Sequence, residues 1–284
     1  MKKTVLLLSG IMVMSCTSQQ KKLVYPETTK VDTIDVYFGT EVPDPYRWLE
    51  NDTSAATAAW VEAENKVTNA YLAQIPFREQ LLKRLTDLAN YEKIGTPFKK
   101  HGKYYFYKND GLQNQSVLYV QDSLDGEARV FLDPNQLSDD GTVALTSLSF
   151  SNDGKYTAYT ISRSGSDWSE IYVMDTATGK LLEDHINWAK FTGAAWQKDG
   201  FYYSAYDAPA KGKEFSNVNE NHKIYYHKIG TPQAEDKLIY ENPAYPKRFY
   251  SAGTSKDERI LFIYESGAGR GNNLFIKDLK IMFL

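Results

Sequence analysis

Few residues of this 284-residue chain have the types and spacing that catalysis needs. A nucleophilic serine of the common hydrolase type lies in a G-x-S-x-G turn, with Asp and His later in the chain. That pattern does not occur in the printed sequence, and the glycine cluster at residues 267–271 has no serine at its centre. No strand-to-helix junction surrounds this cluster, so we interpret it as a hairpin loop and not as a phosphate-binding loop.

The four histidines also lack the spacing of a metal site. His101 precedes Gly102 in a predicted turn, and His185 falls in a predicted connecting segment. His222 and His227 are five residues apart, so they would lie on opposite faces of a strand. We therefore expect no metal and no cofactor to be bound by these side chains.

The beginning of the chain predicts export. Lys2 and Lys3 precede an apolar run at residues 5–13, which is too short to cross a bilayer as a helix. We expect residues 1–15 to be a signal peptide and residues 16–24 to be a polar tether.

Cys16 is the only cysteine, so a disulfide within the chain is excluded. The four residues ending at Cys16 read VMSC and are similar to the cleavage box of bacterial lipoproteins. Cys16 would then carry a lipid that anchors the protein to a membrane, in the periplasm or at the outer membrane of a bacterium. The alternative is a plain secretory signal with an incidental cysteine.

Composition favours a globular, β-rich protein. Hydrophobic residues make up 42% of the chain and charged residues 24%, which is enough apolar material for a sizeable core. The 21 tyrosines favour strands over a helical bundle. The formal net charge is −3, so nothing indicates a nucleic acid as partner.

Residues 25–94 predict a helical amino-terminal segment. The string DPYRWLE at residues 44–50 predicts a rigid turn, because proline fixes its own φ and restricts the residue before it. An apolar stripe with helical spacing predicts a helix at residues 54–75, and Pro76 could begin a second helix. The apolar face of that second helix would consist of Phe77, Leu81, Leu82, Leu85 and Leu88.

Residues 95–284 predict a repeated β-structure. Four similar strand-like strings, SVLYVQD, EIYVMDT, KIYYHKI and NLFIKDL, place an aromatic residue at positions 119, 172, 225 and 275, with separations of 53, 53 and 50 residues. Turn strings at residues 151–156, 197–202 and 255–260 each precede an alternating apolar run, as hairpin turns do. A period of about 50 residues with several short strands is typical of β-propeller blades.

The length after residue 95 predicts about four blades, since 190 residues remain and each blade needs about 50. Residues 280–284 have no character of a capping end, and repeat architectures need protected ends. We therefore interpret the chain as a truncated gene product or fragment.

The two most unusual strings, DPYRWLE and SRSGSDW at residues 162–168, carry a resemblance to a known family. From about residue 25 to residue 279 the chain resembles the amino-terminal part of the prolyl oligopeptidase family of serine peptidases. The resemblance implies a mainly β fold, namely about four blades of a seven-bladed β-propeller preceded by a helical segment. The catalytic α/β-hydrolase domain of the family would be absent from this chain.

The resemblance also implies substrate-binding residues. The aspartate of SGSDW is Asp167, which would pair with an arginine of the catalytic domain; the alternative is a turn aspartate that caps backbone groups. Phe191, in the string KFTGAAW, and Phe249 would line an apolar subsite; the alternative for both is packing within a blade core. A small thiol expected on the same wall is replaced by Lys277. DPYRWLE would be structural, pinning the helical segment to the catalytic domain.

Two functions follow. The first is the non-catalytic propeller portion of a serine endopeptidase that cleaves short proline-containing peptides after proline, with no catalytic residue in this chain and a missing hydrolase domain as partner. The family needs no cofactor. The alternative is a peptide-binding lipoprotein without catalysis.

Overall fold

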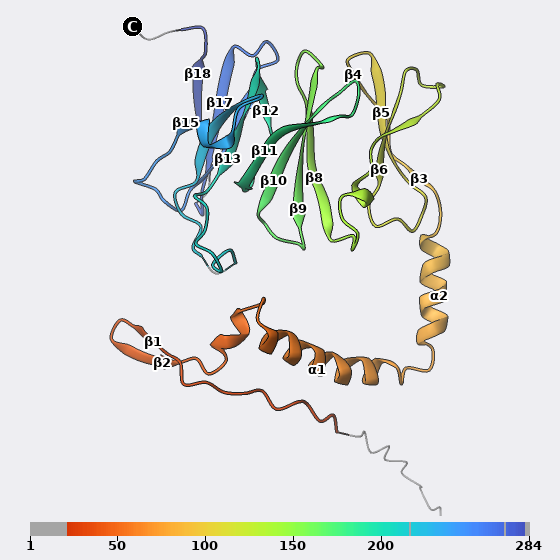
Figure 1. The fold of residues 1–284 in the computed structure, drawn as a ribbon, viewed down its shortest axis with the longest axis vertical. Helices are drawn as coiled ribbons and strands as arrows, with labels where there is room; N and C mark the ends of the chain where they lie inside the picture. The colour runs from red at the N-terminus through yellow and green to blue at the C-terminus, as the bar shows by residue number, and fades with distance from the viewer. Residues whose placement is uncertain (1–21, 216, 270, 282–284) are drawn as a thin grey trace, which may run out of the picture. The chain divides into compact units, whose positions relative to one another are not determined.

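The computed structural model describes residues 22–215, 217–269 and 271–281 (Figure 1). The chain divides into two compact units, Met1–Lys83 and Arg84–Leu284. The signal peptide and the acylated Cys16 predicted above lie outside the described residues. Within the described residues no helix has both the length and the apolar character that crossing a membrane would need.

The first unit contains a β-hairpin, a 3₁₀ turn and one long helix. Its elements are β1 (Ile34–Tyr37), β2 (Thr40–Pro43), η1 (Arg47–Glu50) and α1 (Ala55–Leu72), and α2 (Arg78–Ala89) crosses the boundary between the units. Helix α1 begins after Ser54, whose hydroxyl oxygen accepts the Thr57 N–H at 3.1 Å as an N-cap. It ends three residues earlier than the predicted residue 75, and Pro76 disfavours a helical conformation at the residue before it.

The DPYRWLE string forms a turn, as predicted, and connects parts of the first unit. The Arg47 guanidinium donates to the carboxylates of Asp35 and Asp44, the latter at 2.6 Å. The Trp48 indole N–H donates to the Thr29 carbonyl at 2.8 Å. These contacts hold the hairpin and the 3₁₀ turn against the strand-free segment that precedes them.

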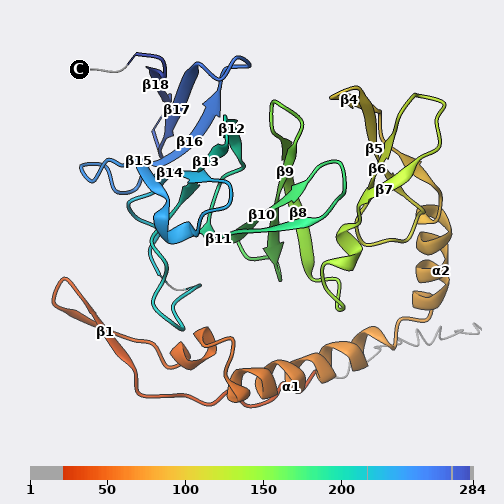
Figure 2. The same ribbon diagram turned by 45° about the horizontal axis from the view of Figure 1, so that its top comes forward.

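The second unit contains three antiparallel sheets, and because the eight-stranded one comprises two blades joined by β11 and β13, the unit has four blades that follow one another along the chain (Figures 1 and 2). The first blade contains β3 (Lys93–Ile94), β4 (Phe98–Lys100), β5 (Lys103–Asn109), β6 (Val117–Gln121) and β7 (Arg129–Leu132). The second contains β8 (Val143–Phe150), β9 (Tyr156–Arg163), β10 (Ser169–Asp175) and β11 (Leu181–Ala189). The third contains β12 (Ala195–Gln197), β13 (Gly200–Ala205), β14 (Lys223–Lys228) and β15 (Lys237–Tyr240). The fourth contains β16 (Phe249–Thr254), β17 (Ile260–Ser266) and β18 (Asn273–Asp278).

Neighbouring blades pack face to face through apolar side chains. Strand pairing between the second and third blades is limited to one residue pair, Ala189 opposite Ala205, and much of the remaining contact is side-chain packing. Ile171 and Ile186 of the second blade share a core with Phe201 and Tyr203 of the third. This arrangement is a β-propeller segment of four blades, and it confirms the predicted fold class.

The four repeated strings form the equivalent strand of each blade, namely β6, β10, β14 and β18. In the first three blades the aligned aromatic residue lies directly opposite another ring on the preceding strand, with nearly parallel planes. These pairs are Tyr119 with Phe106, Tyr172 with Tyr159, and Tyr225 with Tyr203. Cross-strand aromatic pairs stabilise a sheet, which explains the repeated aromatic.

The three predicted turn strings form the turns between the first two strands of the second, third and fourth blades. Glu258 in the last of them connects all three. Its carboxylate accepts the Lys198 backbone N–H at 2.6 Å and the Asn152 side-chain N–H at 2.7 Å. Glu258 itself has a left-handed φ of 56°, a conformation that is uncommon outside glycine.

The apolar face predicted for the second helix is exposed. Helix α2 begins at Arg78, two residues after Pro76, and its leucines are 49% to 55% exposed at positions 81, 82, 85 and 88. Phe77, just before the helix, is also exposed.

Candidate functional site

The two predicted phenylalanines lie together on the surface of the second unit. Phe191 follows β11 and Phe249 begins β16, and their ring centroids are 6.0 Å apart with planes at 50°. Phe191 is 51% exposed and Phe249 is 42% exposed. Neither side chain is buried in a blade core. Two adjacent exposed rings form an apolar surface that can receive a ligand side chain.

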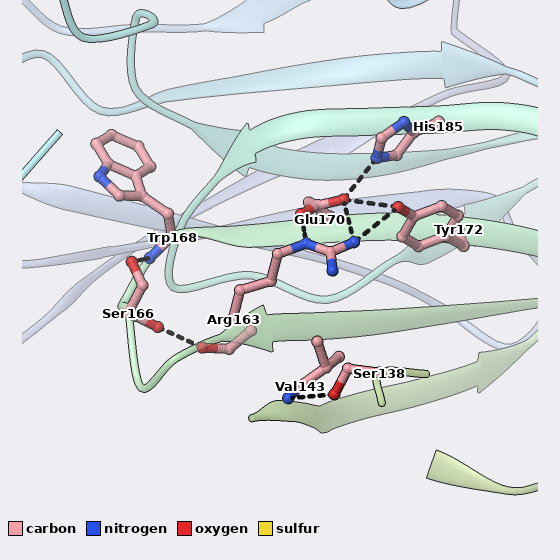
Figure 3. A network of polar contacts seen from close by, with 9 residues as sticks. Ser138, Val143, Arg163, Ser166, Trp168, Glu170, Tyr172 and His185 are labelled. Atoms are coloured by element: carbon pink, nitrogen blue, oxygen red, sulfur yellow. Dashed lines mark hydrogen bonds and ion pairs between the residues drawn. The ribbon is translucent and has the colours of Figure 1, made fainter. Parts of the chain in front are cut away.

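Asp167 lies in the turn between β9 and β10, and its side chain is 72% exposed. The serine beside it, and not Asp167, caps this turn: the Ser166 hydroxyl oxygen accepts the Trp168 N–H at 3.0 Å (Figure 3). Among the described residues no backbone N–H is hydrogen-bonded to the Asp167 carboxylate. An exposed carboxylate in a turn held by its neighbours is available to a cationic partner.

Lys190 connects Asp167 to the aromatic pair. Its side chain is only 7% exposed, and its Nζ lies 3.9 Å from an Asp167 carboxylate oxygen and 3.4 Å from the Asn219 side-chain oxygen. The same Nζ lies 4.6 Å from the Trp168 ring centroid and 5.5 Å from that of Phe191. We call these five residues, Asp167, Trp168, Lys190, Phe191 and Asn219, the Lys190 cluster.

His222 supports both phenylalanines through their neighbours in the chain. Its Nδ1 accepts the Tyr250 backbone N–H at 2.9 Å, so its Nε2 carries the proton and donates to the Lys190 carbonyl at 3.0 Å. Burial lowers the pKa of His222 to about 4, outweighing the opposing effect of the hydrogen bond to Lys190. The ring is therefore neutral at physiological pH, which matches the one-donor, one-acceptor arrangement.

His227, on the opposite face of the third blade, is charged. Its Nε2 lies 2.9 Å from Asp184 of the second blade, and its Nδ1 lies 2.7 Å from Asp236. The contacts of His222 and His227 confirm that the two side chains lie on opposite faces. The pKa of His227 is raised, because hydrogen bonds to both carboxylates outweigh the desolvation that lowers it. His227 thus connects two blades and takes no part in the surface site.

His185 lies in strand β11, so its predicted place in a connecting segment is wrong. It contacts the Glu170 carboxylate, which also accepts hydrogen bonds from Arg163 and Tyr172 (Figure 3). These three hydrogen bonds outweigh desolvation and lower the pKa of Glu170 to about 2. The network fixes the surface of the second blade below the turn that carries Asp167.

Trp168 anchors a second segment of the site. Its indole N–H donates to the Glu214 carbonyl at 2.7 Å, and its ring meets Trp188 edge-on at 5.4 Å.

A pocket of about 290 Å³ lies beside these rings and is also lined by Phe215. A larger pocket of about 670 Å³ is lined by residues 244–248, 265–269 and 271–273.

Sequence reasoning missed Lys190, His222 and Trp188 as parts of this site. Lys190 directly precedes Phe191 in the KFTGAAW string, and this position could have indicated a role in the site. Its burial depends on tertiary contacts, which the sequence alone does not give. Lys277, near which the family resemblance predicts a small thiol, lies in strand β18 and is exposed.

The arrangement can bind a ligand, and its described part contains no nucleophile activated by a base. No histidine among the described residues is hydrogen-bonded to a serine hydroxyl. The described residues also hold no cluster of three or more side chains suited to a metal ion. The site offers two exposed rings, an exposed carboxylate and a buried ammonium.

The fold defines the second unit as a segment of a β-propeller. A profile of the prolyl oligopeptidase N-terminal β-propeller domain matches residues 26–281. The chain belongs to the prolyl oligopeptidase family.

Similar proteins cover nearly all of this chain. It is 52% identical over 260 residues to the prolyl endopeptidase of Elizabethkingia miricola, covering 91% of this chain and 37% of that protein. It is 34% identical over 284 residues to the dual function macrocyclase-peptidase POPB of Galerina marginata, covering 90% and 39%.

Solved structures agree with these relatives. Prolyl oligopeptidase B from Galerina marginata bound to a 25mer macrocyclization substrate matches with a TM-score of 0.75 and 32% identity, over 90% of this chain and 39% of that one. The same protein without ligand matches with a TM-score of 0.62 and 33% identity, over 91% and 40%. The chain thus spans about two-fifths of the length of the proteins that it matches.

Proposed function

We propose that this chain is the peptide-binding propeller portion of a serine endopeptidase that cleaves short peptides after proline. The observation that carries the proposal is the grouping of Asp167, Phe191 and Phe249 on one exposed face. Relatives named as prolyl endopeptidases, and a related structure with a peptide substrate bound, support a proline-containing peptide as ligand.

In this role the propeller contributes binding and not bond cleavage. The two phenylalanine rings would bury an apolar side chain of the peptide, which stabilises the complex through the hydrophobic effect. The exposed Asp167 would pair with an arginine of the hydrolase domain that holds the peptide. The serine, aspartate and histidine of acyl transfer would come from that α/β-hydrolase domain, which is the partner the proposal requires.

Peptide binding by the purified 284-residue chain tests the proposal. A fluorescent proline-containing peptide should bind saturably, and Phe191→Ala should weaken binding about tenfold by removing half of the apolar surface. Phe38→Ala is the matched control, because Phe38 is a fully exposed ring in the first unit. Equal binding by wild type and Phe191→Ala would contradict the site.

A hydrolysis assay separates the two functions that the sequence allows. The purified chain should not release the chromophore of a Gly-Pro substrate, and adding a separately expressed hydrolase domain of the relative should restore release. Binding without any such restoration would favour the peptide-binding lipoprotein. Hydrolysis by the chain alone would contradict both.

We also propose lipid attachment at Cys16, on the basis of the VMSC string and the absence of any other cysteine. This would anchor the protein to a bacterial membrane in the periplasm or at the outer membrane. Expression with radiolabelled palmitate should label wild type, while Cys16→Ser should remain unlabelled and leave the membrane fraction. Labelling of the variant would contradict the anchor.

A further inference from the structure

Lys190 is a buried cation with more hydrogen-bond donors than acceptors. Its ammonium group carries three N–H bonds. Within the described residues the only acceptor at hydrogen-bond distance is the Asn219 side-chain oxygen, at 3.4 Å. The Asp167 carboxylate oxygen, at 3.9 Å, is too far for a hydrogen bond. A buried charge with unfilled donors is costly, so its retention needs a reason.

Lys223 provides a comparison, because acceptors lie within hydrogen-bond distance of its ammonium group. The Lys223 Nζ lies 2.5 and 2.7 Å from the two carboxylate oxygens of Asp207. Lys190 has no comparable contact, although its side chain is less exposed than that of Lys223, at 7% against 16%. Lys190 thus lacks the close carboxylate contacts that Lys223 makes.

The position of the ammonium points to a ligand. Nζ lies near both the Trp168 and the Phe191 ring, and Phe191 is half exposed beside Phe249. A peptide lying on Phe191 would bring its own backbone within reach of Nζ. The same ligand would fill the donors and cover the exposed rings.

The acceptor that fits best is a neutral carbonyl. A peptide carboxylate would gain from Lys190 but would be repelled by the exposed Asp167 carboxylate beside it. A main-chain carbonyl accepts a charge-assisted hydrogen bond without that repulsion. We propose that Lys190 is a substrate-binding residue that donates to the backbone carbonyl of the peptide residue packed on Phe191. This proposal rests on the proposed function, because it takes a peptide as the ligand of this face.

A double-mutant cycle between peptide and protein tests the proposal. The probes are acetyl-Phe-Gly-Pro-amide and its analogue with an (E)-alkene in place of the Phe–Gly amide, which lacks the carbonyl and the N–H of that amide but keeps its shape. Wild type should bind the amide peptide about 10- to 100-fold more tightly than the alkene, as expected for a hydrogen bond to a charged group. Lys190→Met should lose most of this discrimination, since the variant lacks the ammonium that donates to the carbonyl.

Two controls guard against a purely structural effect. Lys228→Met removes the same charge from an exposed position on β14 and should keep the full discrimination. If Lys190→Met does not fold, Lys190→Gln supplies the same measurement with a side chain that retains polar contacts, and it should reduce the discrimination.

The outcomes separate this inference from the proposed function. Equal binding of both peptides by wild type, or undiminished discrimination in the folded Lys190 variants, overturns the role of Lys190 and leaves peptide binding intact. Failure of wild type to bind either peptide overturns both proposals.

Discussion

His222 donates from Nε2 to the backbone carbonyl of Lys190 over 3.0 Å. The other ring nitrogen accepts the backbone N–H of Tyr250. One neutral imidazole therefore joins the chain neighbours of Phe191 and Phe249, the two exposed rings of the site. The geometry of the site depends on a buried residue that does not itself reach the surface.

This relationship predicts an acid-sensitive fold. The pKa of His222 falls from 6.5 in the unfolded chain to about 4 in the folded protein, so between these values the unfolded state binds more protons. Stability should therefore fall as pH drops from 6.5 to 4, by about 3 kcal/mol from this residue. Urea unfolding across this range should show a weaker pH dependence for His222→Gln.

His227 predicts a pH dependence of the opposite sign. Its folded pKa is raised above 6.5 by Asp236 and Asp184, which outweigh desolvation. Its contribution to stability is fully present below pH 6.5 and is lost as pH rises through the folded value. His227→Gln should cost about 3–5 kcal/mol at pH 6, because two buried carboxylates lose their cation. Denaturant unfolding at pH 6 and pH 9 measures both, and an equal cost at the two pH values would contradict the charged assignment.

Glu258 combines a left-handed backbone conformation with side-chain hydrogen bonds, and two variants separate their effects on stability. Glu258→Ala should lose about 1–2 kcal/mol, since the Lys198 N–H and the Asn152 amide lose their acceptor. Glu258→Gly loses the same contacts but relieves the left-handed φ of 56°, so it should be about 1 kcal/mol more stable than the alanine variant. Unfolding of the pair in guanidinium isolates the strain. An alanine variant as stable as the glycine variant would show that none is stored there.

Helix α2 predicts dye binding by the purified chain. Leu81 and Leu85 are about half exposed on its apolar face, and exposed apolar clusters bind hydrophobic dyes. The double variant Leu81→Glu, Leu85→Glu should reduce the dye fluorescence at least twofold. Leu124→Glu, at an exposed leucine in a turn, serves as control and should leave it unchanged. A dye-silent wild type would contradict the exposed face.

The sequence predicted the parts of this fold that repeat locally. An aromatic residue recurs at positions 119, 172 and 225 because each one packs against a ring on the adjacent strand. The same packing requirement in every blade therefore produces the repeat period seen in the sequence. The hairpin strings were also recognisable, since turn chemistry involves residues that are close in the chain.

The contacts that shape the site were not predictable in the same way. Lys190 is buried by Trp168, which is 22 positions earlier, and bonded to Asn219, which is 29 positions later. His227 contacts Asp184 across 43 residues. No local pattern reports such distances, so the burial of Lys190 and the charge of His227 required the three-dimensional structure. The exposure of Phe191 and Phe249 was likewise undecided, because apolar side chains on strands serve cores and surfaces alike.

Trp168 predicts a loss of local order without a loss of global stability. Trp168→Phe keeps an aromatic ring but removes the indole N–H that donates to the Glu214 carbonyl at 2.7 Å. One lost hydrogen bond is worth about 1 kcal/mol, so amides flanking Glu214 should exchange with deuterium about fivefold faster. Trp188→Phe is the matched control, because its indole N–H has no protein acceptor in the described part of the chain. Mass spectrometry of exchanged peptides measures both variants. Equal rates around Glu214 in the two would show that this hydrogen bond does not hold the segment in place.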